Sequence, residues 1–265
     1  MTTEEALATF AGKFGASKYR PTFGRSLVSE VKKLNSRAIM ITIVIGLVFQ
    51  LGTSYLMTSP DWIEGSGYEV VTFGAQFIAL YMIIFGTLAV TTEYSHNTMR
   101  TTALADPNRT RAFASKLTAV ALLSGIFLIA MLIVAWFIAT IQIDSFAPFN
   151  EGIKPYAAMI AFLILVALMS ASFGYILRST AGTIALMTVL MFLADLFVLL
   201  PVEFFQKTYS QLTPYALLTK AISGSNPAFT ESVLFESQWI ALAIFAGYTL
   251  VVVISGWVLY RKRDA

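Results

Sequence analysis

The chain has 265 residues and a formal net charge of +3, and 57% of its residues are hydrophobic while only 12% are charged. A soluble domain carries about 25% charged residues, so this chain has too few charges to cover a surface that faces water. The composition therefore excludes an ordinary soluble enzyme, a disordered chain and a nucleic-acid-binding module. It predicts an all-α protein that crosses a membrane several times, and the mean hydropathy of +0.73 agrees with this prediction.

The first predicted element is an amphipathic helix within residues 1–38, a polar segment that we expect in the cytoplasm. Phe23, Leu27, Val31 and Leu34 recur at helical spacing and share one face, and the basic residues of the segment lie away from it. A basic amphipathic helix just before a membrane span is typical of a helix that lies in the membrane interface. The alternative is an amphipathic cap on a soluble part of the protein.

Six apolar runs follow, and together they predict one transmembrane domain over residues 39–260 with a short tail over 261–265. A helix needs about 20 apolar residues to cross about 30 Å of hydrocarbon. All eight prolines fall between the runs, as expected because proline disrupts a helix interior. The predicted spans are residues 39–57, 70–91, 117–142, 156–177, 184–200 and 239–260.

The positions of the basic residues predict the orientation of the spans. If both termini lie in the cytoplasm, 15 of the 18 lysines and arginines lie on the cytoplasmic side. Cytoplasmic connections carry such an excess of lysine and arginine. We therefore expect a multi-pass protein of the plasma membrane with cytoplasmic N- and C-termini.

The connection between the second and third runs, residues 93–116, has the most informative sequence. Asn97 or Thr98 suits the N-cap of a short helix, and residues 106–108 (Asp-Pro-Asn) should end it. The expected helix lies roughly in the membrane plane and forms a cytoplasmic ledge on which a cytosolic protein docks. The alternative is a basic loop that only fixes the topology.

Asp195 is the one ionisable acid or base inside a predicted run. One interpretation is a carboxylate that faces a cavity and is linked to a proton or a substrate. The other is a structural acid that is protonated or hydrogen-bonded to Gln50, Gln76 or a tyrosine. The following connection, residues 201–238, is rich in apolar and aromatic residues, which predicts short helical pieces at the outer leaflet.

Ser170 and Gly174 in the fourth run have the spacing of small residues that permits close helix contact. Packing inside the protein and association of two copies explain this pattern equally well.

The chain lacks the motifs of several kinds of chemistry. It contains no cysteine, one histidine, no phosphate-binding G-x-x-x-x-G-K-[ST] sequence, and neither H-E-x-x-H nor G-x-S-x-G. We therefore expect a chain that is not an enzyme and that has no nucleotide, cofactor or metal site of its own.

The order of these pieces resembles the permease subunits of ATP-binding-cassette exporters of the type-2 membrane-domain family. Residues 29–37 are similar to the junction between the amphipathic elbow helix and the first span of that family. Residues 93–102, E-Y-S-H-N-T-M-R-T-T, with the following Pro-Asn-Arg and Lys116, resemble the coupling-helix loop of actinobacterial members.

This resemblance implies an exporter in which two permeases, identical or homologous, pair with separate cytosolic ATPases that bind ATP and Mg²⁺. The substrate would pass between the permeases, which are embedded in the lipid bilayer. A coupling helix over residues 98–105 would dock on the ATPase. The residues that the resemblance places at this docking surface are Glu93, Thr98, Met99, Arg100, Thr101, Thr102 and Leu104.

Two other functions fit the composition. One is an ion-coupled secondary transporter that uses Asp195, although the proline-free runs and the lack of an inverted repeat disfavour carriers with broken helices. The other is a membrane scaffold or sensor that transports nothing.

Overall fold

The computed structural model describes residues 22–34, 37–57, 68–96, 98–99, 108–143, 149, 153–224 and 234–262. Within these ranges every regular element is a helix, which confirms the predicted all-α class. In chain order the elements are α2 (Phe23–Lys33), α3 (Arg37–Met57), α4 (Tyr68–Thr72), α5 (Ala75–Ser95), α7 (Arg109–Gln142), α8 (Lys154–Leu177), α9 (Thr180–Thr188), η1 (Val189–Leu193), η2 (Ala194–Leu199), α10 (Glu203–Lys207), η3 (Tyr209–Gln211), α11 (Pro214–Ser223) and α12 (Gln238–Lys262).

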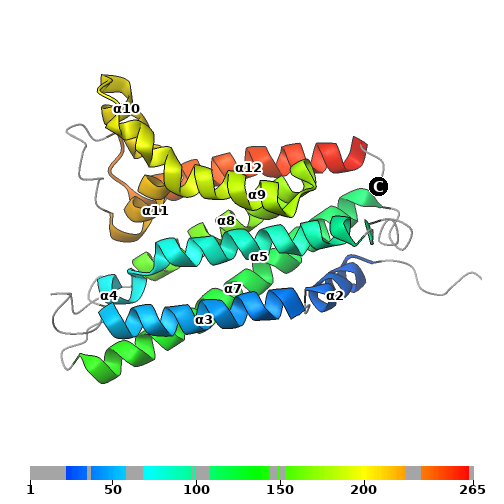
Figure 1. The fold of residues 1–265 in the computed structure, drawn as a ribbon, viewed down its shortest axis with the longest axis horizontal. Helices are drawn as coiled ribbons and strands as arrows, with labels where there is room; N and C mark the ends of the chain where they lie inside the picture. The colour runs from blue at the N-terminus through cyan, green and yellow to red at the C-terminus, as the bar shows by residue number, and fades with distance from the viewer. Residues whose placement is uncertain are drawn as a thin grey trace, which may run out of the picture.

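The long helices form an elongated bundle in which α5 and α8 lie between α3 and α7 on one side and α9 and α12 on the other (Figure 1). The helix α2 and the C-terminal end of α12 lie at one end of the bundle, which we call the α2 end. The short helices α4, α10 and α11 lie at the opposite end, which we call the α11 end. The short helices predicted between residues 201 and 238 are thus present as α10, η3 and α11.

Among the described residues, five helices are long and apolar enough to cross a membrane, as expected of a multi-pass membrane protein. They are α5, α7, α8, the continuous helical segment Thr180–Leu199, and α12. The first predicted run forms α3, whose apolar stretch Ile39–Thr53 is shorter than these five. Large apolar side chains are exposed on α3, α7 and α12, such as Val48, Phe137 and Val251, which suits contact with lipid.

The helix α7 begins earlier than the predicted third run, which starts at residue 117. Its first residue is Arg109, and the Oδ1 atom of Asn108 caps it by accepting a hydrogen bond from Arg111 N at 3.1 Å. At 1.5 Å per residue, its 34 residues span about 51 Å, more than the hydrocarbon needs. The basic start of α7 therefore belongs to the helix and extends it beyond the apolar layer at the α2 end.

The second and fifth predicted runs are not single regular helices. The second divides into α4 and α5 at Phe73 and Gly74, where no proline marks the break. The fifth begins at Thr180, behind a Ser179 cap that accepts from Gly182 N at 3.2 Å, and then changes from α to π to 3₁₀ winding.

The core forms where α5, α8 and α12 approach closely. A side chain at Gly86 of α5 would overlap the carbonyl oxygen of Ala167 in α8, and one at Gly256 of α12 would lie 3.0 Å from Ser172 O. The hydroxyl of Ser170 lies 2.8 Å from that of Thr87 and thus bonds α8 to α5. The small residues of α8 therefore serve packing within the chain.

Candidate functional site: a buried ion cluster

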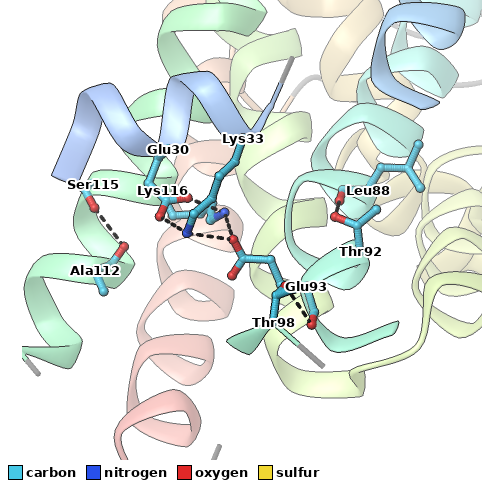
Figure 2. A network of polar contacts seen from close by, with 9 residues as sticks. All are labelled: Glu30, Lys33, Leu88, Thr92, Glu93, Thr98, Ala112, Ser115 and Lys116. Carbon is cyan, nitrogen blue, oxygen red and sulfur yellow. Dashed lines mark hydrogen bonds and ion pairs between the residues drawn. The ribbon is translucent and has the colours of Figure 1, made fainter. Parts of the chain in front are cut away.

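Four charged side chains meet at the α2 end, and we call them the ion cluster: Glu30, Lys33, Glu93 and Lys116. They come from three helices, since the first two lie on α2, Glu93 is near the end of α5, and Lys116 is in the first turns of α7. Figure 2 shows the two ammonium groups placed between the two carboxylates.

The ion cluster is continuous, because each lysine contacts both glutamates. Lys33 Nζ lies 2.7 Å from Glu30 Oε1 and 3.2 Å from Glu93 Oε1. Lys116 Nζ lies 2.6 Å from Glu93 Oε1 and also forms an ion pair with Glu30 Oε2. The two positive and two negative charges cancel, so the ion cluster adds no net charge to the interior.

Three of the four side chains are buried, so the loss of one partner would strongly destabilise the fold. The exposed fraction is 4% for Glu30, 7% for Glu93 and 2% for Lys116, whereas the Lys33 side chain is 36% exposed. Removing one partner from a buried pair leaves an uncompensated charge and costs about 3–5 kcal/mol. Burial lowers the pKa of Lys33, but the hydrogen bond to Glu30 and the charges of both glutamates outweigh it, so the pKa lies above its ordinary value.

The amphipathic helix α2 is present where the spacing predicted it, and it brings Glu30 and Lys33 to the ion cluster. On the predicted apolar face, Leu34 is buried and Leu27 and Val31 pack against the core, whereas Phe23 is exposed. Two basic residues, Lys32 and Lys33, occupy its last turn, where positive charge interacts favourably with the helix dipole.

The end of α5 fixes the start of the connection to α7. The backbone oxygen of Glu93 accepts a hydrogen bond from Thr98 N at 3.0 Å, while the Glu93 carboxylate lies in the ion cluster. Thr98 is exposed and Met99 is 5% exposed. The connection therefore leaves α5 in a tight turn. Glu93 holds this turn through its backbone oxygen and binds the two lysines through its carboxylate.

The residues predicted to dock on a partner divide into three groups. Glu93 and Met99 are buried, and Thr98 is exposed. Arg100, Thr101, Thr102 and Leu104 lie outside the described residues, as does most of the predicted coupling helix.

The other end of the connection is tied to the C-terminal end of α12. Arg109 Nη1 donates hydrogen bonds to Tyr260 O at 3.3 Å and to Arg261 O at 3.0 Å. These are among the last carbonyls of α12. No N–H group within the helix can donate to the last carbonyls of a helix, and the guanidinium supplies the missing donors. Trp257 Nε1 adds a bond to Thr110 Oγ1 at 3.3 Å.

Aromatic rings fill the space beside the ion cluster. The Tyr175 ring lies 4.9 Å from the Phe113 ring and 5.0 Å from the Tyr260 ring, measured between centroids, and joins α8 to α7 and α12. Arg178 ends α8 in the left-handed conformation, with φ of 52°, and its guanidinium lies 5.2 Å from the centroid of the Tyr94 ring. These contacts tie α5, α7, α8 and α12 together beside the ion cluster.

Asp195, the remaining predicted site residue, lies in η2, close to η3 and α11 and remote from the ion cluster. Thr213 hydrogen-bonds to Asp195, whereas the sequence suggested Gln50, Gln76 or a tyrosine as the partner. Gln76 Oε1 accepts from Tyr215 OH at 3.1 Å. In the described part of the chain, no three histidine, aspartate or glutamate side chains are grouped as a metal ion would require.

The family described as "Protein of unknown function (DUF2705)" matches residues 36–265 of the chain. The chain belongs to this family. No curated protein matches the chain. The matched region includes Glu93 and Lys116, whereas Glu30 and Lys33 precede it, so the ion cluster joins the family region to the helix before it.

Proposed function

We propose that the chain is the permease subunit of an ATP-driven exporter of the type-2 ABC family, coupled to a separate cytosolic ATPase through residues 93–116. A second permease, identical or homologous, completes the substrate pathway in the plasma membrane. The ATPase binds ATP and Mg²⁺, so this chain is not itself an enzyme. In this proposal α3 is the first of six spans, α2 is the interfacial elbow helix, and both termini are cytoplasmic.

The observation that supports this proposal most is that the ion cluster holds both ends of the connection between α5 and α7. Glu93 precedes the connection and Lys116 follows it, and their charged atoms lie 2.6 Å apart. A protein that binds the connection therefore acts on two membrane helices at once. Through Glu30 it also acts on α2, which leads directly into α3.

The ion cluster makes it costly for the helices to separate when a partner moves the connection. Separating α5 from α2 and α7 would take Glu93 away from both lysines and leave it as a buried unpaired charge, at a cost of about 3–5 kcal/mol. Binding of ATP by a partner supplies a preference between two states of the whole assembly, and that preference shifts their populations. The helices α2, α5 and α7 then move as one unit at this end of the bundle.

The burial of Glu93 assigns it a positioning role. Its carboxylate binds Lys33 and Lys116, and its backbone oxygen holds Thr98 at the start of the connection. In the proposed complex, direct contacts with the ATPase come from Thr98 and from the residues after it, with Arg100 first among them. Glu93 acts through the turn that presents those residues.

Purification from the native membrane tests the proposal. The wild-type chain should retain an associated, vanadate-sensitive ATPase in mild detergent, and Arg100→Glu should reduce the retained activity at least tenfold. Lys207→Glu is the matched control, because it reverses an exposed charge on α10 at the α11 end and should leave the retained activity unchanged. Transport by the purified chain alone, driven by an ion gradient and without nucleotide, would overturn the proposal in favour of a secondary transporter.

A further inference from the structure

The helical segment that carries Asp195 has an irregular backbone at the α11 end. Its π-helical part, Val189–Leu193, is followed directly by the 3₁₀ part, Ala194–Leu199. The hydroxyl of Tyr209 donates to the Ala194 carbonyl at 3.0 Å. Short π-helical segments are rare and occur frequently at functional sites. In a membrane helix such a departure is tolerated where other groups satisfy the backbone, as Tyr209 does here.

The carboxyl group of Asp195 is only partly satisfied by the protein. Thr213 hydrogen-bonds to it, and because Thr213 Oγ1 accepts from Ala216 N at 3.3 Å, the Thr213 hydroxyl proton remains to be donated. Asp195 Oδ1 is enclosed and has no hydrogen-bond partner in the part of the chain that the structure describes. No lysine, arginine or histidine of the described residues forms an ion pair with this carboxylate.

The end of a neighbouring helix offsets part of the cost of burying a negative charge at this position. Thr213 is the N-cap of α11, so the carboxylate lies near the positive end of that helix dipole. A carboxylate in a membrane segment is costly, and such residues commonly mark substrate or ion pathways. An anionic group that has support from a helix N-terminus and no cationic partner among the described residues is suited to a cation supplied by a ligand.

Three aromatic rings contact one another beside η2, and one of them, Tyr209, lies near the Asp195 carboxylate. The centroid of the Tyr209 ring lies 5.4 Å from that of Phe205 and 6.2 Å from that of Phe197, and the latter two are 6.1 Å apart. Burial raises the pKa of Tyr209, and the charge of Asp195 raises it further, so the carboxylate and the aromatic group share one electrostatic environment. Aromatic faces attract organic cations, most strongly where water is excluded.

We propose that Asp195, together with Phe197, Phe205 and Tyr209, binds the charged group of an amphiphilic organic cation, such as a quaternary ammonium or phosphonium with apolar substituents. Phe197 is 53% exposed and Leu199 is 76% exposed, so the ligand reaches the rings across an apolar outward surface. A metal ion is disfavoured, because Ca²⁺ takes about 6–8 oxygen ligands and the site offers one carboxylate. The cation site itself does not depend on the proposed exporter. Only the further step, that such cations are the substrates it transports, rests on the proposed function.

Two probe ions of equal size and opposite charge test the site directly. The full chain in lipid nanodiscs should bind tetraphenylphosphonium more tightly than tetraphenylborate. Asp195→Asn, which keeps the shape of the side chain, should weaken tetraphenylphosphonium binding at least tenfold and leave tetraphenylborate binding unchanged. Glu203→Gln is the matched control, because it removes an exposed carboxylate from the neighbouring α10 and should leave the binding of both ions unchanged.

Aromatic variants separate ring recognition from the hydrogen bond of Tyr209. Tyr209→Phe keeps the ring and should retain most of the affinity for tetraphenylphosphonium. Tyr209→Leu and Phe205→Leu should weaken it about 2- to 30-fold, the range expected for one cation–π contact. Melting temperatures of the variants show whether each is folded, and Asp195→Asn removes a costly charge, so it should fold.

The assay needs no ATPase, so its outcome is independent of the proposed function. Loss of cation binding in Asp195→Asn, with no ATPase found in any preparation, would leave the cation site standing without the exporter. The inference is overturned if Asp195→Asn binds tetraphenylphosphonium as the wild type does, or if tetraphenylborate binds equally well, even when an ATPase copurifies.

Discussion

The ammonium group of Lys116 lies 2.6 Å from Glu93 Oε1, and these two buried residues stand before and after the connection that joins α5 to α7. A single contact therefore closes the connection into a loop whose two ends cannot move independently. Glu30 extends the same contact to α2, which lies outside the bundle of long helices. The proposed coupling between the connection and the membrane helices depends on this contact.

Lys116→Met tests the energetic weight of the ion cluster, because it keeps the length of the side chain and removes the charge. Two carboxylates then lose a buried partner, and we expect the free energy of unfolding to fall by about 3–5 kcal/mol. Unfolding in mixed micelles measures the change. Lys207→Met, which removes an exposed lysine from the pair with Glu203, is the control and should unfold as the wild type does. Equal stability of the two variants would show that the buried charges do not hold the helices.

Charge reversal distinguishes a four-residue cluster from two separate pairs. Lys33 contacts Glu93, and Glu30 contacts Lys116. Exchanging only Glu93 and Lys116 therefore puts a second positive charge beside Lys33 and a second negative charge beside Glu30. We therefore expect Glu93→Lys with Lys116→Glu to remain strongly destabilised. Reversing all four charges restores every opposite-charge contact and should recover part of the stability. Full rescue by the two-residue exchange would contradict the cluster.

The raised pKa of Lys33 predicts how its contribution depends on pH. A lysine whose folded-state pKa exceeds its ordinary value of 10.5 stabilises the fold fully below that value, and the contribution is lost as the pH rises through the folded-state pKa. The stability difference between wild type and Lys33→Met should therefore be constant from neutral pH to about pH 10 and shrink above the ordinary pKa. Unfolding curves at stepped pH values measure this, and a difference that grows at high pH would contradict the assignment.

The helices were largely predictable because hydropathy alone decides them. The run predicted over residues 156–177 is α8, and that over 239–260 is α12, each within a few residues. The start of α7 was not predictable in this way, since Arg109 and Lys116 read as a polar connection although the helix continues through them. The left-handed residue at the end of α8 had no signal either, because it is Arg178 instead of a glycine.

The ion cluster was only partly visible in the sequence. Glu30 and Lys33 have the i, i+3 spacing of a helical ion pair, and this spacing indicates their contact, which we did not predict. Glu93 was singled out through the family resemblance as a docking residue, whereas Lys116 entered only as part of the resembling loop and among the charges that set the topology. Their pairing crosses between helices that the sequence does not place in space, so packing decides it.

Gly86 provides a test of the close contact between α5 and α8. Gly86→Ala would place a methyl group against the carbonyl oxygen of Ala167, and because both are backbone-fixed, the two helices must separate. We expect a loss of more than about 3 kcal/mol in unfolding free energy, at the upper end of overpacking effects. Gly247→Ala, in α12 with open space around the position, should instead be neutral or stabilising by up to about 1 kcal/mol. Tolerance of Gly86→Ala would contradict this packing.

The most direct test of the central claim is whether nucleotide bound by a partner at the α2 end changes the opposite end of the bundle. The chain has no cysteine, so a single cysteine at the exposed Ser237, just before α12, can be labelled alone with a membrane-impermeant maleimide. In proteoliposomes holding the complex with its ATPase, trapping Mg-ATP with vanadate should change the labelling rate several-fold, and the same nucleotide should have no effect on the chain alone. A labelling rate that is indifferent to nucleotide in the intact complex would contradict the account.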